Sequence, residues 1–334
     1  MLLLAFGTRP EFLKIKPLIN VFNKNGIEYK LLFTGQHEDL LNNVKVDQHI
    51  KISDLGNRLD NIINSIMNVI NWNGIDYVIV QGDTTSVLAV ALSAFHNKIP
   101  VIHLEAGLRT FDKQNPYPEE TNRRIVSAIA DYHLCPTESS LTNLLIEKIE
   151  GRMSVVGNTA LDNLIEWKNK CEYTNDILIT LHRRENHNQM QEWFKEINSL
   201  AKKYSKLNFI FPIHPNPNVK KHKHLLKEKN IKTLNPLEHN VLLSILVNTR
   251  LVITDSGGIQ EECSFFNKIC LTCRKVTERP EAIGQSTFLV KNPLELSILF
   301  DIFVNNYEIN HISPFGDGNS ANKIVETLKT WKIV

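Results

Sequence analysis

Three carboxylate side chains stand where an apolar run ends or a helix would begin. Asp83 lies in "VQGDTTS", Glu105 in "HLEAG" and Glu119 in "NPYPEETNRR". Carboxylates gathered in one cleft can remove and return protons by general acid–base catalysis. Two of them also have simple structural explanations, because Asp83 could cap a helix and Glu119 could pair with Arg123. Glu105 is harder to explain that way, since an acid directly after "VIHL" must be paired, hydrated or shifted in pKa.

A glycine turn in "TDSGGIQEE" indicates a second kind of chemistry, the binding of an anion. Ser256, Gly257 and Gly258 would present backbone N–H groups at the start of a helix, where a phosphate binds well. The same residues could be only a helix cap. Glu262, about one turn further on, is placed to accept hydrogen bonds from a ribose.

Two further polar residues follow predicted strands. Arg9, in "GTRPEFLKIKP", could bind a diphosphate through its guanidinium or form an ordinary salt bridge. His182, in "LHRREN", stands at a strand end, where a histidine can be functional or structural. The chain contains neither a P-loop G-x-x-x-x-G-K nor a G-x-G-x-x-G motif, which argues against phosphoryl transfer and hydride transfer.

Short apolar runs alternate with amphipathic segments along the whole chain, and the polar clusters follow the apolar runs. Nearly continuous hydrophobic strands separated by helices are typical of parallel sheets covered on both faces. Because such sheets bind ligands at the carboxyl ends of their strands, the polar clusters should gather at those edges. We predict strands at Leu2 to Phe6, Tyr29 to Thr34, Tyr77 to Gln81, Val101 to Leu104, Tyr132 to Pro136, Met153 to Val156, Ile177 to Leu181, Phe209 to Pro212, Lys232 to Leu234, Leu251 to Thr254 and Ile269 to Thr272.

The length of 334 residues favours two domains, because one core rarely grows to that size. The boundary is predicted within Asn163 to Asp176, where a helix gives way to a polar connection. The expected domains are residues 1–165 with 318–334, and residues 166–317. A cleft between two α/β doubly wound domains would collect the strand-end residues of both.

Composition excludes several classes of function. Lys and Arg number 38 against 36 Asp and Glu, and a net charge of +2 gives no overall field for nucleic acid or an anionic membrane. No stretch approaches the ~18 apolar residues of a membrane span, and the start resembles a buried strand more than a signal peptide. We therefore expect a cytoplasmic protein.

Metal and disulfide sites are also disfavoured. Five scattered cysteines do not form a disulfide framework, and "CLTC", Cys270 to Cys273, lacks the second pair of ligands that a zinc site needs. The basic stretch Asn218 to Asn230 is predicted to be a solvated helix rather than a metal site, since its two histidines do not share a face.

The motifs taken together have a more specific meaning. They span Phe6 to Ala321 and closely resemble the UDP-N-acetylglucosamine 2-epimerase family, including its hydrolysing branch. The ordered set that carries this resemblance is "FGTRPE", "TGQH", "VQGDTTS", "HLEAGLRT", "YPEETNRR", "PTESS", "VGNTALD", "LHRREN", "HPNP", "DSGGIQEE", "TERPEA" and "FGDGNSA".

The resemblance implies a glycosyltransferase B-type architecture, with the nucleotide held mainly by the second Rossmann-like domain. A C-terminal helix, here "NSANKIVETLKTWKIV", would cross back to the first domain. Family chemistry removes the C2 proton as UDP leaves C1, which gives a 2-acetamidoglucal. UDP then adds back to give UDP-N-acetylmannosamine, and neither NAD nor a metal is required. The expected partners are a UDP-sugar and a second copy of the chain in a homodimer.

The resemblance also assigns residues. Asp83, Glu105 and Glu119 match the acidic catalytic positions of the family, and His182 matches an active-site histidine. Residues that match nucleotide or diphosphate contacts are Arg9, His214, Ser256, Gly257, Gly258 and Glu262, with Lys14 as a further candidate. Glu120 has no such match and is assigned to its helix.

Two departures from the family pattern leave alternatives open. The segment after "TGQH", residues 38–61, is compact, and in non-hydrolysing members this neighbourhood helps to hold a second, activating UDP-sugar. The region "AIGQSTFLV" is also abbreviated. The remaining hypotheses are a reversible epimerase, a hydrolysing epimerase that releases N-acetylmannosamine, a 2-epimerase of a related UDP-sugar, a glycosyltransferase on the same fold, and a non-catalytic nucleotide-sugar sensor.

Overall fold

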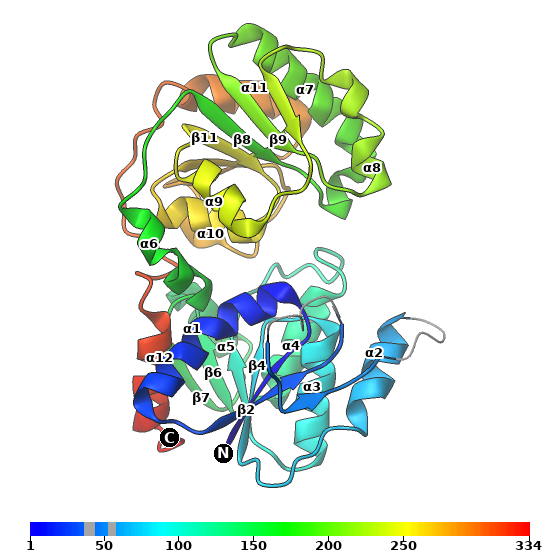
Figure 1. Cartoon of the computed structure of the whole chain (residues 1–334), viewed down its shortest axis with the longest axis vertical. Helices are drawn as coiled ribbons and strands as arrows, with labels where there is room; N and C mark the ends of the chain where they lie inside the picture. The colour runs from blue at the N-terminus through cyan, green and yellow to red at the C-terminus, as the bar shows by residue number, and fades with distance from the viewer. Residues whose placement is uncertain (37–43, 53–57) are drawn as a thin grey trace. The chain divides into compact units, whose positions relative to one another are not determined.

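A computed structural model describes residues 1–36, 44–52 and 58–334 (Figure 1). The described residues form two compact units. Unit 1 contains Met1–Asn163 and Gly316–Val334, and unit 2 contains Leu164–Phe315. Each unit is built on a parallel sheet with helices packed against it, so the predicted α/β class is confirmed.

In unit 1 the described residues form a seven-stranded parallel sheet in the order β3-β2-β1-β4-β5-β6-β7. The strand order reverses between β1 and β4, which is where doubly wound folds bind their ligands. The strands are β1 (Leu2–Phe6), β2 (Tyr29–Phe33), β3 (Gln48–His49), β4 (Tyr77–Gln81), β5 (Val101–Leu104), β6 (Tyr132–Cys135) and β7 (Arg152–Val155).

Alternating side chains of β1 enter two different cores, as the pleat of a strand requires. Leu3 and Ala5 pack with the buried face of α3, whereas Leu4 and Phe6 pack with α1 and α12. A strand covered on both faces is apolar throughout, which explains the continuous hydrophobic run at the start of the chain. The helices of this unit are α1 (Arg9–Asn25), α2 (Arg58–Met67), α3 (Thr85–His96), α4 (Glu119–Ile129), α5 (Glu138–Ile146) and α12 (Ser320–Thr330), with a 3-10 turn at Thr159–Leu164.

Unit 2 repeats the same topology with a six-stranded parallel sheet of described residues, in the order β10-β9-β8-β11-β12-β13. Its reversal lies between β8 and β11, where Thr180 and Thr254 are paired. The strands are β8 (Asp176–Thr180), β9 (Asn208–Pro212), β10 (Ile231–Leu234), β11 (Leu251–Thr254), β12 (Ile269–Thr272) and β13 (Thr287–Leu289).

Large aromatic residues fill the core of unit 2. Phe209 and Phe211 of β9 pack with Trp193 and Phe194 of α7 and with Phe300 of α11. The helical segments of the unit are α6 (Ile165–Lys168), α7 (Met190–Lys203), α8 (Pro217–Lys220), α9 (His239–Leu246), α10 (Gly257–Phe265) and α11 (Pro293–Phe303), with 3-10 turns at Arg184–Gln189, Lys223–Leu225 and Pro280–Ala282.

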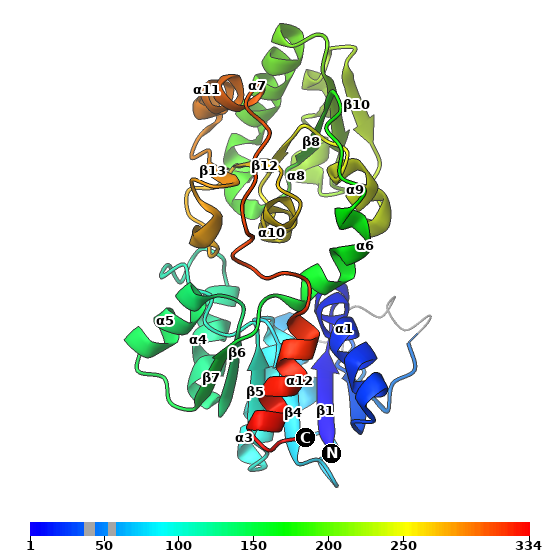
Figure 2. The ribbon, with the colours of Figure 1, turned by 90° about the vertical axis from the view of Figure 1, so that its left-hand side faces the viewer.

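The last helix, α12, belongs to unit 1 although it follows unit 2 in the chain. It lies beside α1 in both ribbon views, and its buried Ile324, Val325 and Leu328 enter the same core as β1 (Figure 2). Asp162 accepts hydrogen bonds from the backbone of Ser320, at 3.0 Å, and of Ala321, at 2.7 Å, which satisfies two free amides at the start of the helix.

Some expected elements differ from the structure. The two-residue strand β3 and the three-residue strand β13 were not predicted, because runs this short carry almost no periodic signal. The predicted helix over Asn218 to Asn230 is wrong: only α8 and one 3-10 turn form there. Like charges one helical turn apart repel, and Leu225 and Leu226 pack on the core from an irregular segment instead.

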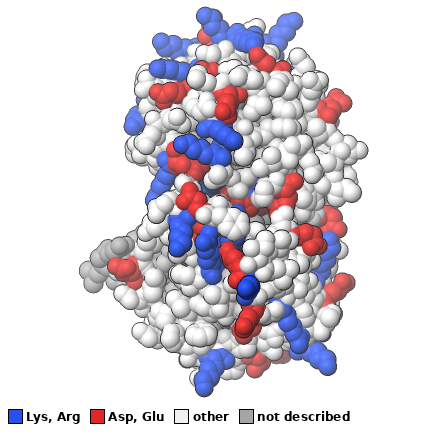
Figure 3. Space-filling model, turned by 180° about the vertical axis from the view of Figure 1, so that it is seen from behind, with Lys and Arg blue, Asp and Glu red and all other residues white. Residues whose placement is uncertain are grey.

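Charged side chains are mixed rather than segregated. On the face shown in Figure 3, basic and acidic side chains are interspersed and separated by uncharged areas. Among the described residues, no helix combines the length and the apolar composition that crossing a bilayer requires.

Candidate active site

A pocket of about 230 Å³ opens at the carboxyl ends of β1, β4 and β5 in unit 1. Three of the predicted site residues, Lys14, Asp83 and Glu105, line it together. The other lining residues are Thr8, Pro10, Glu11, Gln81, Gly82 and Thr84. The strand-end positions therefore bring polar side chains to one edge of the sheet.

The Glu105 carboxylate lies in this pocket, and contacts with neighbouring side chains offset the cost of burying it. Its backbone has a positive φ of 69°, a conformation that L-residues seldom adopt and that often occurs at functional sites. Its Oε2 lies 2.5 Å from Lys14 Nζ and also accepts a hydrogen bond from the buried Gln81 amide. Only 7% of the Glu105 side chain is exposed, so the ammonium and the amide replace the lost hydration of the carboxylate.

Asp83 does not cap α3, because the capping residue is Thr84, whose hydroxyl accepts a hydrogen bond from Val87 N–H. The Asp83 carboxylate instead pairs with Arg123, whose Nε lies 3.0 Å from Oδ2 and whose Nη2 contacts the same oxygen. Asn122 donates a hydrogen bond to the Asp83 carbonyl at 3.0 Å. The alternative of a structural cap is therefore wrong for Asp83, and α4 is fixed beside it.

Glu119 is the first residue of α4, one turn before the residues that contact Asp83. Its Oε2 is buried and has no hydrogen-bond partner among the described residues. It is not among the residues that line the 230 Å³ pocket. The guanidinium of Arg123 pairs with Asp83 and Glu120, so the suggested Glu119–Arg123 pair is replaced by other partners.

Glu120 serves its helix and the loop before it. Its carboxylate is fully buried and accepts hydrogen bonds from the backbone amides of Thr110, at 3.0 Å, and Phe111, at 3.1 Å. It also pairs with Arg123 and Arg124. These contacts agree with its assignment to a structural role.

The carboxyl group of Glu11 already occupies the first βα turn of unit 1. Glu11 accepts hydrogen bonds from the amides of Gly7, at 2.5 Å, and Thr8, at 3.1 Å, and it completes a capping box with Thr8. Burial raises the pKa of Glu11. Because a carboxylate occupies the amides that bind phosphate in other doubly wound folds, this turn is not an open diphosphate site. Arg9 begins α1, is exposed, and is not among the residues that line the pocket.

A second pocket, of about 310 Å³, opens in unit 2 at the carboxyl ends of β8, β9 and β11. It brings together five of the predicted residues: His182, His214, Ser256, Gly258 and Glu262. The other lining residues are Thr180, Leu181, Pro212, Pro236, Leu237, His239, Leu242 and Ile259.

The start of α10, at the edge of this pocket, has backbone donors left unfilled by the described residues. The Ser256 side chain makes no capping hydrogen bond, and the amides of Gly257 and Gly258 have no acceptor among the described residues. Gly257 is not among the residues that line the pocket, and a Cβ there would lie 2.6 Å from Arg279 Nη1. Its backbone amide remains at the helix N-terminus, where the helix dipole favours a negative charge.

Glu262 lies one turn further along α10. One oxygen, Oε1, lies 2.9 Å from His239 Nε2, while Oε2 is buried without a hydrogen-bond partner among the described residues. A ligand hydroxyl at Oε2 would satisfy this oxygen, as the position of Glu262 beyond the glycine turn predicts.

His182 is held between a carboxylate and a second imidazole. Its Nδ1 lies 3.2 Å from Asp255 Oδ1, and its ring stacks on His214 with centroids 5.2 Å apart. Burial lowers the pKa of His182, and the Asp255 carboxylate opposes that effect. Burial likewise lowers the pKa of His214, and His182 lowers it further. Both rings are therefore favoured in their neutral forms.

Sequence reasoning missed several residues that hold the predicted ones. Asp255, Arg123, Gln81 and His239 all touch a predicted site residue. Asp255 and Gln81 do have a signal, because each is a polar residue at the end of an apolar strand. Arg123 and His239 lie in helices, and spacing alone does not indicate their partners.

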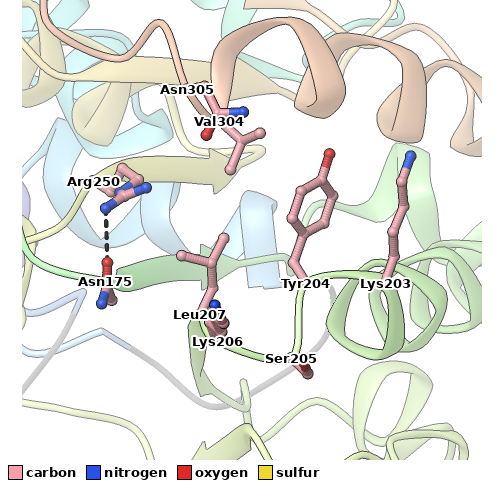
Figure 4. Close-up of a pocket in the computed structure, with 9 residues that line it drawn as sticks. All are labelled: Asn175, Lys203, Tyr204, Ser205, Lys206, Leu207, Arg250, Val304 and Asn305. Atoms are coloured by element: carbon pink, nitrogen blue, oxygen red, sulfur yellow. Dashed lines mark hydrogen bonds between the residues drawn. The ribbon is translucent and has the colours of Figure 1, made fainter.

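A third hollow, of about 400 Å³, is at the opposite edge of the unit 2 sheet (Figure 4). Two of its cations already have partners: Arg250 donates to Asn175 at 2.7 Å, and Lys203 pairs with Asp301 at 2.5 Å. Since doubly wound sheets bind ligands at the carboxyl ends of strands, this hollow is a weaker candidate.

Cys270 and Cys273 are free and buried, and the described residues contain no cluster arranged to hold a metal.

Comparisons with known proteins show which sequences and structures this chain resembles. The family model described as UDP-N-acetylglucosamine 2-epimerase matches residues 20–329. A UDP-N-acetylglucosamine 2-epimerase of Neisseria meningitidis serogroup A is 37% identical over 365 residues, which cover 98% of both chains.

Two crystal structures resemble the whole chain. A UDP-GlcNAc 2-epimerase from Neisseria meningitidis bound to UDP-GlcNAc has a TM-score of 0.87 at 35% identity, covering 98% of this chain and 99% of that one. One from Methanocaldococcus jannaschii, in complex with UDP-GlcNAc and UDP, has a TM-score of 0.80 at 34% identity with the same coverage.

Proposed function

Because the chain belongs to the UDP-N-acetylglucosamine 2-epimerase family, we propose that it interconverts UDP-N-acetylglucosamine and UDP-N-acetylmannosamine. It is an isomerase of the glycosyltransferase B-type fold. In a bacterium the product would serve as a precursor of surface polysaccharide. The observation that carries the proposal is the pocket in unit 1 where Asp83 and Glu105 meet beside Lys14.

The proposed reaction begins at C2 of the sugar. A carboxylate of unit 1 takes the C2 proton, the C–H electron pair forms a C1–C2 double bond, and the C1–O bond breaks with its electrons leaving on UDP. The C2–H bond is only feebly acidic, so its loss is feasible only as the diphosphate departs. UDP then adds back to C1 while a proton is delivered to the opposite face of C2. Inversion thus needs groups on both faces of the sugar, and Asp83, Glu105 and Glu119 are the proposed set.

Unit 2 is proposed to hold the UDP portion. The open amides at the start of α10 and the neighbouring histidines would stabilise the diphosphate as it leaves. The unpartnered Oε2 of Glu262 would accept a ribose hydroxyl. The first βα turn of unit 1 supports this division, since Glu11 already occupies its amides.

We propose that UDP, rather than water, adds to the 2-acetamidoglucal intermediate. Both routes share the first step, so the carboxylates do not separate them. Within residues 38–61, the segment that would bear on an activating UDP-sugar, residues 38–43 and 53–57 lie outside the described residues.

One assay tests whether the protein is a 2-epimerase and whether it belongs to the non-hydrolysing or the hydrolysing branch. The protein is incubated with UDP-N-acetylglucosamine in heavy water, and the products are followed by NMR. We expect deuterium at C2 and a mixture of the two UDP-sugars. Absence of exchange with this and related UDP-sugars would overturn the epimerase proposal. Free UDP with N-acetylmannosamine would select the hydrolysing branch instead.

A further inference from the structure

Asp255 is a fully buried carboxylate at the end of β11, beside the end of β8. Its Oδ2 accepts hydrogen bonds from the backbone of His182, at 2.9 Å, and of Arg183, at 2.8 Å, and from the Asn186 amide at 3.0 Å. Its Oδ1 lies 3.1 Å from the His182 backbone nitrogen and 3.2 Å from His182 Nδ1. The carboxylate is therefore fixed by one loop, with an oxygen directed at the imidazole of that loop.

We propose that Asp255 is the positioning residue of His182: it keeps the ring proton on Nδ1 and so makes Nε2 a hydrogen-bond acceptor until a diphosphate binds. A diphosphate then converts the ring to an imidazolium, and Nε2 donates a hydrogen bond to a phosphate oxygen. The proton comes from solvent, and no covalent bond to carbon or phosphorus changes. This inference rests on the proposed function, because it takes the ligand of this pocket to be a nucleoside diphosphate.

The position of Asp255 determines which ring nitrogen of His182 carries the proton. A carboxylate is negative and can only accept a hydrogen bond, so its oxygen 3.2 Å from Nδ1 stabilises a proton on that nitrogen. Nε2 lies on the other side of the ring, and no described residue is hydrogen-bonded to it. The partner of one ring nitrogen sets the state of the other, so a proton on Nδ1 leaves a lone pair on Nε2.

His214 is held in the opposite state. Its Nδ1 accepts a hydrogen bond from the Asn216 backbone N–H at 3.2 Å, so a neutral His214 carries its proton on Nε2. The two rings stack with an interplanar angle of 19°, and both line the same pocket. The pocket thus presents one acceptor and one donor from neighbouring imidazoles.

The charges around His182 explain why a ligand would change its state. Asp255 favours the imidazolium, whereas Arg183 and His187 oppose it, and burial lowers the pKa of His182 most strongly. His214 also faces the ring. A diphosphate adds negative charge to this set, and negative charge nearby raises the pKa of a histidine. With Asp255 behind the ring, binding and proton uptake become linked.

The tautomer of His182 can be measured in the unmodified protein. Histidine labelled with ¹⁵N distinguishes Nδ1–H from Nε2–H by NMR, and we expect Nδ1–H for His182 without ligand at about pH 7.5. In Asp255→Asn the amide can donate to Nδ1, so we expect the Nε2–H form. An Nε2–H tautomer in the unmodified protein would overturn the proposal, even if the variant fails to fold.

Proton uptake on binding gives the second test. UDP is titrated by calorimetry at about pH 7.5 in buffers of different ionisation enthalpy, which yields the protons taken up per UDP bound. We expect about one proton for the unmodified protein and close to none for Asp255→Asn or His182→Gln. Asp301→Asn, the same change on the surface of unit 2, should match the unmodified protein.

The outcomes separate the two proposals. If UDP binds without proton uptake, or with equal uptake in Asp255→Asn, the role of Asp255 is refuted while the proposed function stands. If UDP does not bind at all, the proposed function fails, and the tautomer measurement still decides whether Asp255 positions His182.

Discussion

Glu119 and Glu120 are neighbours in the sequence, but the protein surrounds their carboxylates very differently. Glu120 is fully buried and is bonded to two amides and two arginines. Glu119 has a buried oxygen without a partner among the described residues. An oxygen that costs desolvation energy without a protein partner is more easily explained by a substrate than by the fold.

This difference gives a prediction with a built-in control. We expect Glu119→Gln, like Asp83→Asn, to lower kcat by about 100-fold or more and to leave UDP affinity within about threefold. Glu120→Gln should instead lower the free energy of unfolding by about 2–4 kcal/mol, because it removes a buried, hydrogen-bonded charge. Steady-state kinetics, calorimetry with UDP and urea unfolding measure the three quantities. Equal losses of stability in Glu119→Gln and Glu120→Gln would contradict a catalytic role for Glu119.

A buried histidine of unit 1 should make stability depend on pH. Burial lowers the pKa of His103 from 6.5 to about 3, although its Nε2 lies 2.8 Å from the Gly82 carbonyl. Between pH 6.5 and about 3, His103 binds a proton in the unfolded state but stays neutral in the folded state. Its stabilising contribution is therefore complete above pH 6.5 and is lost progressively as pH falls toward 3.

We expect the free energy of unfolding to fall by about 2 kcal/mol from this group between pH 6.5 and 5. Urea unfolding at a series of pH values measures the slope. His103→Gln should make the slope shallower, whereas His96→Gln, at an exposed position of α3, should leave it unchanged. Identical slopes in all three proteins would show that His103 is not protonated on unfolding.

The sequence indicated which residues stand at strand ends, but it did not indicate which side chains they pair with. Because parallel strands end at a common edge, Asp83 and Glu105 could be expected in one place, and they line one pocket together with Lys14 of α1. The partner of Asp83 is Arg123, 40 residues away on another element. Side-chain pairs at that distance depend on how helices pack, which one sequence does not reveal.

The bounds of a strand could be predicted from the sequence where the strand is buried on both faces. Strands such as β4, β5, β11 and β12 are buried on both faces, so their apolar runs mark their bounds. The strand β13 is three residues long and follows a polar turn, which leaves no periodic signal. Hydrophobic pattern therefore predicts central strands well and sheet edges poorly.

The two glycines that start α10 should respond differently to substitution by alanine. A Cβ at Gly257 would lie 2.6 Å from Arg279 Nη1, and Arg279 is held by ion pairs with Glu261 and Glu278. Gly258 has its nearest atom 4.0 Å away. We expect Gly257→Ala to destabilise the protein by about 1–3 kcal/mol through this clash.

Gly258→Ala should behave in the opposite way. Alanine favours a helix over glycine by about 0.5–1 kcal/mol, so the protein without ligand should be equally or more stable. The new methyl group lines the unit 2 pocket, and we expect it to weaken UDP binding by about tenfold. Thermal unfolding and UDP titration check both variants. Unchanged UDP affinity in Gly258→Ala would argue against the start of α10 as the diphosphate site.

The first and last residues of the chain belong to the same unit. We propose that the two units are separate folding domains, with α12 completing the first one. Leu328 of α12 and Leu246 of α9 are both fully buried, the former in unit 1 and the latter in unit 2. They form a matched pair, because the same truncation removes the same side chain from two different cores.

We expect Leu328→Ala and Leu246→Ala each to cost about 2–5 kcal/mol, but in different units. Hydrogen exchange followed by mass spectrometry should show faster exchange in β1 and β4 for Leu328→Ala, with β8 and β11 unaffected. Leu246→Ala should show the reverse pattern. Because α12 is separated from β1 by the whole of unit 2 in the sequence, protection lost at the N-terminus would demonstrate that the last helix stabilises the first domain. Uniform loss of protection in both variants would mean that the two units unfold as one.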